Sequence, residues 1–360
     1  MFLMQFLLVC STLWQLMIMA PATIMPEPAV SAASAIVVCA DSGDVLFEKN
    51  ADEERSIASI TKIMTAVVAL EAADRQDKVI VFEKSMAAEG SSLYLQPGES
   101  LPLTELVKGM LCVSGNDAAN AVAIGIAGSK ERFAGLMNAK ARTLGMTHTH
   151  FVNPSGLEEE GHYSSARDMA ILCRYAMENE SFAAIVSQKK LTVHYANPSG
   201  KTRECVNHNR LLSTAEGCIG IKTGYTKTAG RTLTSCAQRS GIRMIVVTLD
   251  DSDDWNDHQQ LLDYGFSRVE KRVLTDSSYR LSVPLTGGTK DTVTVRPTGE
   301  CSCTAVKDKA LQLQQAVYLP HFLYAPTACG TVVGKLCWSK DGIIIASVPL
   351  CVAESVDSQS

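Results

Sequence analysis

The sequence predicts an α+β fold, in which helices cover an antiparallel sheet, followed by a small all-β domain. Strand patterns stand at both ends of segment 33–270, and helix patterns fill its middle. This order favours one antiparallel sheet over alternating βαβ units. From about Lys271 the chain changes to short β-like runs separated by Gly-containing turns, which is typical of a separate β-sandwich-like domain over 271–360.

The expected sheet combines an early hairpin with strands that come late in the segment. Two apolar runs, 35–40 and 45–47, flank the turn-forming stretch Asp41-Ser42-Gly43-Asp44. We expect this hairpin to join the later strands, because such a sheet would bring Lys222 beside Ser59. The later strand patterns are 220–222, 231–237 and 242–249.

Apolar periodicity and capping residues mark the helices. The first begins near Ser59, where apolar residues recur at helical spacing. Another ends at Gly145, and a third opens at Ser165, with Asp168 three residues later in a capping-box arrangement. The last three expected helices are 131–144, 165–178 and the closing helix 255–266.

Composition and charge exclude a nucleic-acid-binding protein. The chain has 360 residues, of which 46% are hydrophobic and 20% charged, so it is long enough to form two cores. Its formal net charge is −5, and it contains no basic run, zinc-finger spacing or interleaving of aromatic and basic residues.

The N-terminal segment 1–32 predicts an exported protein. Its first 26 residues carry no charged side chain and form an apolar stretch typical of a secretory signal. Cleavage after Ala22 or after Ala32 would leave the first strand intact. The stretch approaches the length of a membrane span and no basic residue precedes it, so an uncleaved anchor stays open. The polar C-terminal stretch 354–360 has no amphipathic pattern, so we expect membrane contact only through the N-terminal segment.

Neither the cysteines nor the acidic and histidine clusters predict a metal or other cofactor. Most of the twelve cysteines lie in apolar runs, which favours buried free thiols. Cys301-Ser302-Cys303 is a close pair without a second pair to complete a zinc site. His148 and His150 have no further ligand at a suitable spacing, and the aspartates of 250–257 lack the glycine and closing Glu of a calcium loop. We expect a solvated helix start there.

Three short motifs in a fixed order outline a serine acyl-transfer site. They are Ser59-Ile60-Thr61-Lys62, Ser114-Gly115-Asn116 and Lys222-Thr223-Gly224. Any one of them is weak, since Ser59 could be a plain helix cap and Ser114 part of an ordinary turn. Together they match the S-x-x-K, S-x-N and K-T-G set of penicillin-recognising serine enzymes.

The first motif pairs a nucleophile with a base. A serine hydroxyl needs a neighbouring base near neutral pH, and a lysine that is kept neutral can act as one. Three residues apart on a helix, Ser59 and Lys62 lie on the same face. The free N–H groups at the start of that helix would stabilise an oxyanion.

Longer segments around these motifs resemble the D-alanyl-D-alanine carboxypeptidases, the low-molecular-weight penicillin-binding proteins. The similar segments, which extend the resemblance to nearly the whole chain after the leader, are 58–66, 151–157, 162–168 and 220–226. The resemblance implies a catalytic domain with the β-lactamase and transpeptidase fold and a C-terminal β domain. It also implies that the partners are peptidoglycan stem peptides as substrates and β-lactam antibiotics as covalent inhibitors, with no cofactor.

The resemblance also implies residue roles. Ser59 would attack the carbonyl between the last two D-alanines, Lys62 would accept its proton and Ser114 would relay a proton to the leaving amine. Asn116 would hold the substrate amide, and Lys222 would attract the terminal carboxylate. The substrate-binding strand would comprise Thr223, Gly224 and Tyr225, with the backbone N–H groups of Ser59 and Tyr225 forming the oxyanion hole.

One position departs from the family pattern. Many members carry an arginine just before the closing helix, where it helps to recognise the carboxylate, but this chain has Asp254 before Trp255. Either Lys222, Thr223 and Arg210 suffice for that task, or activity on small dipeptide-like substrates is weak.

Two other functions remain open from the sequence. A β-lactamase shares the three motifs, but it usually has a Glu-x-x-Leu-Asn segment, which is absent here, and it lacks a C-terminal β domain. A non-enzymatic penicillin-recognising or wall-binding protein would explain Asp254 as decayed catalysis, although the complete motifs argue against it.

Overall fold

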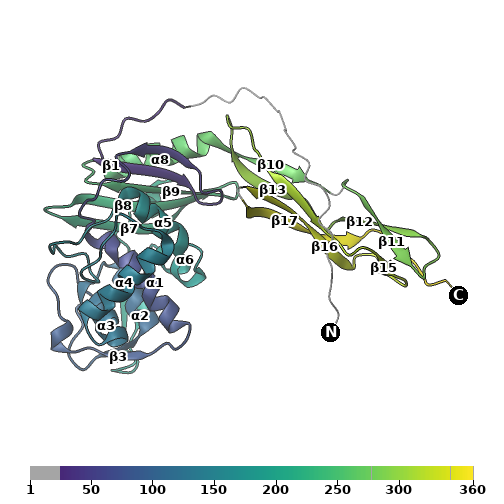
Figure 1. The fold of residues 1–360 in the computed structure, drawn as a ribbon. Helices are drawn as coiled ribbons and strands as arrows, with labels where there is room; N and C mark the ends of the chain where they lie inside the picture. The colour runs from purple at the N-terminus through teal and green to yellow at the C-terminus, as the bar shows by residue number, and fades with distance from the viewer. Residues whose placement is uncertain (1–24, 277, 341, 360) are drawn as a thin grey trace. The chain divides into compact units, whose positions relative to one another are not determined.

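The computed structural model describes residues 25–276, 278–340 and 342–359 (Figure 1). The chain divides into two compact units, one of Met25–Ser267 and one that begins at Arg268. The expected leader 1–32 lies outside the described residues except for 25–32. Within the described part of the chain, no helix combines the length and the apolar character that crossing a membrane requires.

The first unit is built on a five-stranded sheet with the strand order β2-β1-β9-β8-β7. Every neighbouring pair is antiparallel, and Ile36 of the early hairpin pairs with Val247 of a late strand. The predicted antiparallel sheet is therefore confirmed. Its strands are β1 (Ser34–Cys39), β2 (Val45–Lys49), β7 (Cys218–Thr226), β8 (Gly230–Arg239) and β9 (Ile242–Leu249).

Helices cover both faces of this sheet, and its central strands β1, β8 and β9 are buried along most of their length. Ile36 and Val38 face the helical core, whereas a Cβ atom on Gly265 of α8 (Asp254–Arg268) would lie 2.9 Å from Cγ1 of Val37. Figure 1 shows α8 on one face of the sheet and α5 on the other. The other helices of the unit are η1 (Ala58–Thr61), α1 (Lys62–Ala73), η2 (Lys84–Met86), α2 (Leu103–Cys112), α3 (Asn116–Ala127), α4 (Lys130–Leu144), α5 (Ala166–Ala176), α6 (Glu180–Val186) and α7 (Leu211–Thr214).

Two small two-stranded sheets that the sequence patterns did not indicate lie outside the main sheet. They consist of β3 (Val79–Val81) with β4 (Ser100–Pro102), and β5 (Lys190–His194) with β6 (Thr202–Val206). Gly145 ends α4 in the left-handed conformation, as predicted, and the Ser165 side chain accepts a hydrogen bond from the Asp168 N–H. The expected capping box is only half formed, because the Asp168 carboxylate accepts instead from the backbone N–H of His148 and the hydroxyl of Thr149.

The expectation of a solvated start for the closing helix is wrong. Asp251, Asp254 and Asp257 are all buried. The reason is a long-range contact, because Ser31 donates from its backbone N to Oδ2 of Asp257 at 2.6 Å and from Oγ to Oδ1 of Asp251 at 2.7 Å. Val30, the neighbour of Ser31, accepts a hydrogen bond from a side chain of β2. Burial raises the pKa of Asp251.

The second unit contains only β-strands within its described residues. A six-stranded sheet has the order β14-β16-β17-β12-β11-β15, and a separate pair is formed by β10 and β13. Cys301 and Cys303 are buried, unbridged thiols of β13. The strands are β10 (Val269–Thr275), β11 (Leu281–Thr286), β12 (Thr292–Pro297), β13 (Cys301–Val306), β14 (Gln314–Tyr318), β15 (Leu323–Tyr324), β16 (Val332–Lys340) and β17 (Ile343–Val352).

Candidate active site

The serine of the first motif lies in the 3₁₀ turn η1, directly before α1. Ala58 adopts a left-handed conformation with φ of 48°, which turns the chain sharply ahead of Ser59. Gly156 packs against this turn so tightly that a Cβ atom there would lie 1.9 Å from the carbonyl oxygen of Ala58. The strand β7 passes on the other side, where a Cβ atom on Gly224 would lie 2.9 Å from the backbone N of Ser59. Ser59 and its turn are thus held between two glycines.

Lys62 is fully buried and in contact with the serine. Its Nζ lies 2.9 Å from Oγ of Ser59, and it also donates to Oδ1 of Asn116 at 2.7 Å and to the carbonyl oxygen of Ser155 at 2.6 Å. Burial, followed by the nearby charge of Lys222, lowers the pKa of Lys62 well below its ordinary value. This shift favours the neutral amine of Lys62, the form that can accept a proton.

The second and third motifs meet on the other side of the site. Nζ of Lys222 donates to Oγ of Ser114 at 3.1 Å and to the carbonyl oxygen of Thr223 at 2.8 Å. Burial lowers the pKa of Lys222 to about 7. Ser114 has φ of 60°, a left-handed conformation in the turn between α2 and α3.

Asn116, the first residue of α3, is already tied to the protein on both sides of its amide. Its Oδ1 accepts from Lys62, and its Nδ2 donates to the carbonyl oxygen of Glu89 at 2.7 Å. The following residue, Asp117, accepts from the backbone N–H groups of Leu93 and Leu95. The start of α3 therefore fixes both Asn116 and the loop that passes over it.

The strand β7 offers its free edge beside the serine. Among the described residues it is the last strand of the sheet, and its backbone pairs there with β8 on one side only. Thr223 and Gly224 are partly buried, and Tyr225 is exposed. An extended peptide could pair with this edge as an additional strand.

The motifs gave no indication of the role of segment 153–162. Oδ1 of Asn153 accepts from the backbone N–H of Gly156 at 2.8 Å and from that of Ser155 at 3.2 Å, which positions the Ser155 carbonyl that faces Lys62. Nε2 of His162 lies 2.8 Å from Oγ1 of Thr61, and burial lowers the pKa of His162 to about 4. A sequence does not show where a backbone carbonyl points. Only the family resemblance of segment 151–157 could have drawn attention to the carbonyl of Ser155.

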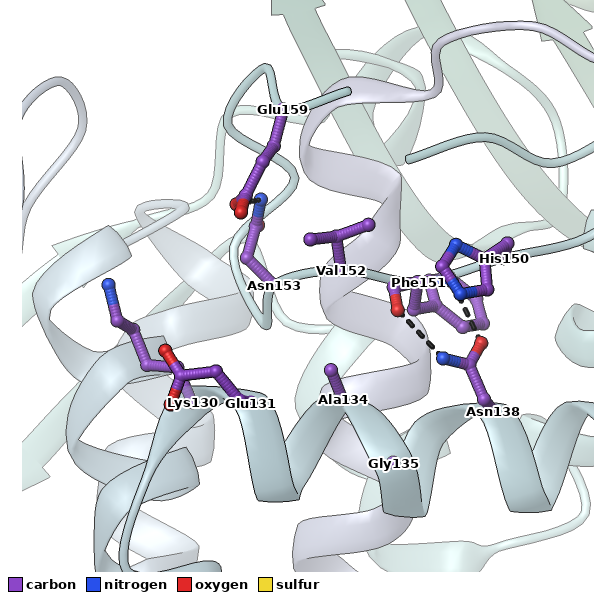
Figure 2. Close-up of a pocket in the computed structure, with 10 residues that line it drawn as sticks. All are labelled: Lys130, Glu131, Ala134, Gly135, Asn138, His150, Phe151, Val152, Asn153 and Glu159. Carbon is purple, nitrogen blue, oxygen red and sulfur yellow. Dashed lines mark hydrogen bonds between the residues drawn. The ribbon is translucent and has the colours of Figure 1, made fainter. Parts of the chain in front are cut away.

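Asn153 also borders a surface cavity of about 360 Å³ between α4 and the following loop. Figure 2 shows the side chain of Asn153 pointing towards Glu159, to which its Nδ2 donates at 3.0 Å. Asn138 of α4 lines the same cavity and forms two hydrogen bonds with the backbone of Phe151. These bonds hold the loop behind Lys62 against α4.

The fold and the site together define an enzyme of the serine acyl-transferring class. A buried lysine of lowered pKa contacts the serine, a second lysine and serine lie opposite, and a free strand edge runs alongside.

Comparisons with known proteins identify the family. Residues 21–253 match the model of the S11 peptidases, the D-alanyl-D-alanine carboxypeptidases, and residues 271–358 match the C-terminal domain of penicillin-binding protein 5. The chain belongs to this carboxypeptidase family and is a serine-type carboxypeptidase. Membership implies peptidoglycan peptides as substrates, binding of β-lactams, and an exported protein.

Individual relatives agree along most of the chain. D-alanyl-D-alanine carboxypeptidase DacF of Bacillus subtilis (strain 168) is 34% identical, covering 92% of this chain and 87% of the relative. DacC of Escherichia coli (strain K12) is 36% identical, covering 92% and 85%. The structure of DacD from Francisella tularensis aligns with a TM-score of 0.66 at 28% identity, covering 96% of this chain and 98% of that one.

Proposed function

We propose that this enzyme removes the terminal D-alanine from peptidoglycan stem pentapeptides through an acyl-enzyme on Ser59. The observation that carries the proposal is the contact of 2.9 Å between Oγ of Ser59 and the buried Nζ of Lys62. The protein would act on the outer, wall side of the cytoplasmic membrane, to which segment 1–32 directs it.

Acylation begins with neutral Lys62. Its Nζ takes the proton as Oγ of Ser59 attacks the carbonyl carbon between the two D-alanines, and the carbonyl oxygen becomes an oxyanion. The backbone N–H groups of Ser59 and Tyr225 bind that oxyanion, and a single such donor contributes about 2.7–4 kcal/mol in serine hydrolases. Because Gly224 has no side chain, β7 can lie close enough to Ser59 for both donors to converge.

Collapse of the tetrahedral intermediate breaks the peptide bond. Ser114 donates its hydroxyl proton to the leaving amine and is reprotonated from the lysine pair, so D-alanine departs with an intact amino group. Water then attacks the acyl-enzyme, with Lys62 again accepting a proton, and Ser59 regains its hydroxyl. The geometry that supports this relay is the contact of 3.1 Å between Nζ of Lys222 and Oγ of Ser114.

The substrate lies along the free edge of β7. Backbone groups from Thr223 to Tyr225 pair with the peptide, and Asn116 contacts the amide of the penultimate residue. Since Asn116 already bonds Lys62 and Glu89, the N–H that it keeps for the substrate is held in a fixed direction.

A single assay distinguishes this function from the two others that share the motifs. Purified protein is incubated with a synthetic stem pentapeptide and, separately, with benzylpenicillin, and the products are measured by mass spectrometry. Release of D-alanine with a long-lived penicillin adduct supports the proposal. Rapid penicillin hydrolysis would indicate a β-lactamase, and failure of both reactions a non-enzymatic protein. Ser59→Ala should form no adduct, whereas Ser85→Ala, a matched change of an exposed serine, should still form one.

A further inference from the structure

The substrate ends in a carboxylate, and Lys222 is poorly suited to bind that charge alone. Lys222 is buried, and its Nζ already donates to Ser114 and to the carbonyl oxygen of Thr223. Its pKa is lowered to about 7 by burial, so near neutral pH a large fraction of the side chain carries no charge. A permanent cation beside this strand would bind the carboxylate at all working pH values.

Arg231 lies next to the substrate strand. It belongs to β8 and pairs directly with Tyr225, while Leu233 pairs with Thr223. Paired residues of antiparallel strands project to the same face, and so do alternate residues of one strand. The side chains of Arg231 and Thr223 are therefore diagonal neighbours on one face, a separation of about 7–8 Å that a long side chain can bridge.

The guanidinium of Arg231 is charged and available. Its side chain is 52% exposed, and its Nη1 lies 3.8 Å from Oδ1 of Asp254, which is too long for a hydrogen bond. The N–H donors of Arg231 are thus not committed to Asp254. Asp254 is nevertheless buried at the start of α8, so its negative charge attracts the guanidinium of Arg231 from a fixed position. The two groups are not in the close contact that would neutralise the arginine.

We propose that Arg231 binds the C-terminal carboxylate of the substrate together with the hydroxyl of Thr223, and that Asp254 is the positioning residue for Arg231. The inference rests on the proposed acyl transfer at Ser59 and names the residue that selects its substrates. It also explains why an acidic residue stands before Trp255, since its charge serves the arginine of the neighbouring strand.

Arg210 is the rival cation. It precedes α7, and its guanidinium carbon lies 5.8 Å from the centre of the Trp255 ring. That stacking occupies one face of Arg210, whereas Arg231 belongs to the strand that pairs with the substrate strand. The register therefore favours Arg231.

The test compares two substrates that differ only in charge at the C-terminus. One is a stem peptide ending in D-Ala-D-Ala, and the other is the same peptide with a terminal carboxamide. We expect Arg231→Gln to lower kcat/KM for the acid about 10- to 100-fold, mainly through KM, and to leave the amide nearly unchanged. Arg231→Lys should restore part of the loss, because lysine keeps the charge without the bidentate geometry. Asp254→Asn should raise KM for the acid alone.

Controls and a second probe make the outcome decisive. Lys227→Gln removes an exposed charge from the hairpin of β7 and β8 and should leave kcat/KM for both substrates unchanged. Acylation of Ser59 by benzylpenicillin and by its methyl ester repeats the comparison without peptide hydrolysis. Equal effects of Arg231→Gln on acid and amide, or an acid-selective loss in Arg210→Gln instead, would overturn the assignment while leaving the acyl transfer intact. A wild-type chain that neither releases D-alanine nor forms a penicillin adduct would overturn the proposed function and this assignment together.

Discussion

Lys62 and Lys222 are two buried lysines of one site, and the charge of Lys222, when it is protonated, adds to the effect of burial in lowering the pKa of Lys62. Two ammonium groups held close together in a medium of low polarity cannot both remain protonated without a large cost in free energy. The proximity of the two lysines therefore favours the neutral form of Lys62 beside Ser59. Neither lysine would have this property alone on a solvated helix or strand.

Lys62→Arg should keep the fold and lose acylation. Arginine is not deprotonated in proteins, so it retains a positive charge but cannot accept the serine proton. General-base catalysis contributes about 10²- to 10⁴-fold, so we expect a loss of that order in the rate of penicillin acylation at neutral pH. The rate is measured by intact mass with time, and circular dichroism checks the fold. Acylation at a near-normal rate would remove Lys62 from the role of base.

Lys222→Gln should shift the pH dependence of acylation. The rate rises with pH as Lys62 loses its proton, so the acid limb of the profile reports the pKa of Lys62. Removing the charge of Lys222 should raise that pKa and move the limb to higher pH, although burial, the larger cause, still holds it below the ordinary value. Lys227→Gln is the control of equal charge and should leave the limb in place. A shift to lower pH would contradict the electrostatic coupling of the two lysines.

Gly156→Ala should strongly destabilise the first unit, because its φ of 78° is left-handed and the new methyl group would collide with the carbonyl oxygen of Ala58. We expect a loss of at least about 2 kcal/mol in the free energy of unfolding. Gly135→Ala is the matched control: it lies within α4 with no atom near the new methyl group, so it should raise stability by about 0.5–1 kcal/mol. Thermal melting of both variants measures the contrast, and similar melting temperatures would argue against the collision.

His258 should make the protein less stable at acidic pH. It is fully buried between Oγ of Ser235 and Oγ1 of Thr248, and burial lowers its pKa to about 3. The unfolded chain takes up a proton below about pH 6.5 and the folded chain does not, so stability is lost as pH falls through that range. Between pH 6.5 and pH 5 the loss should be about 2 kcal/mol.

The measurement for His258 is the slope of stability against pH, because the titration of Asp251 changes stability in the opposite direction. Because the pKa of Asp251 is raised, its carboxyl group holds a proton in the folded state over a pH range in which it is ionised in the unfolded chain. Chemical denaturation of the wild type and of His258→Gln at several pH values separates the two contributions. The variant should lose the histidine part of the slope, even if it is less stable throughout. Parallel curves for the two proteins would show that His258 takes up its proton as readily in the folded state as in the unfolded chain.

The sequence predicted the features that depend on residue type and local spacing. Ser59 and Lys62 could be placed on one face because their separation is a helical one, and Gly145 and Ser165 marked helix boundaries by their own backbone chemistry. The antiparallel sheet followed from the order of strand and helix patterns. These predictions required no knowledge of distant contacts.

Features that depend on distant contacts could not be read in this way. The carbonyl oxygen of Ser155 and the left-handed turn at Ala58 involve backbone groups, which every residue possesses. The aspartates before α8 resemble a solvated cluster until Ser31, far away in the sequence, is known to bond Asp251 and Asp257. A charged run signals exposure only when no other segment covers it.

The bond between Ser31 and the acidic start of α8 joins an early part of the catalytic unit to one of its last. During synthesis Ser31 emerges first, and its partners Asp251 and Asp257 follow only when almost the whole unit has left the ribosome. Segment 25–33 therefore cannot form these hydrogen bonds until the late strands have formed. The contact that buries the acidic start of α8 is therefore among the last that this unit can form during synthesis.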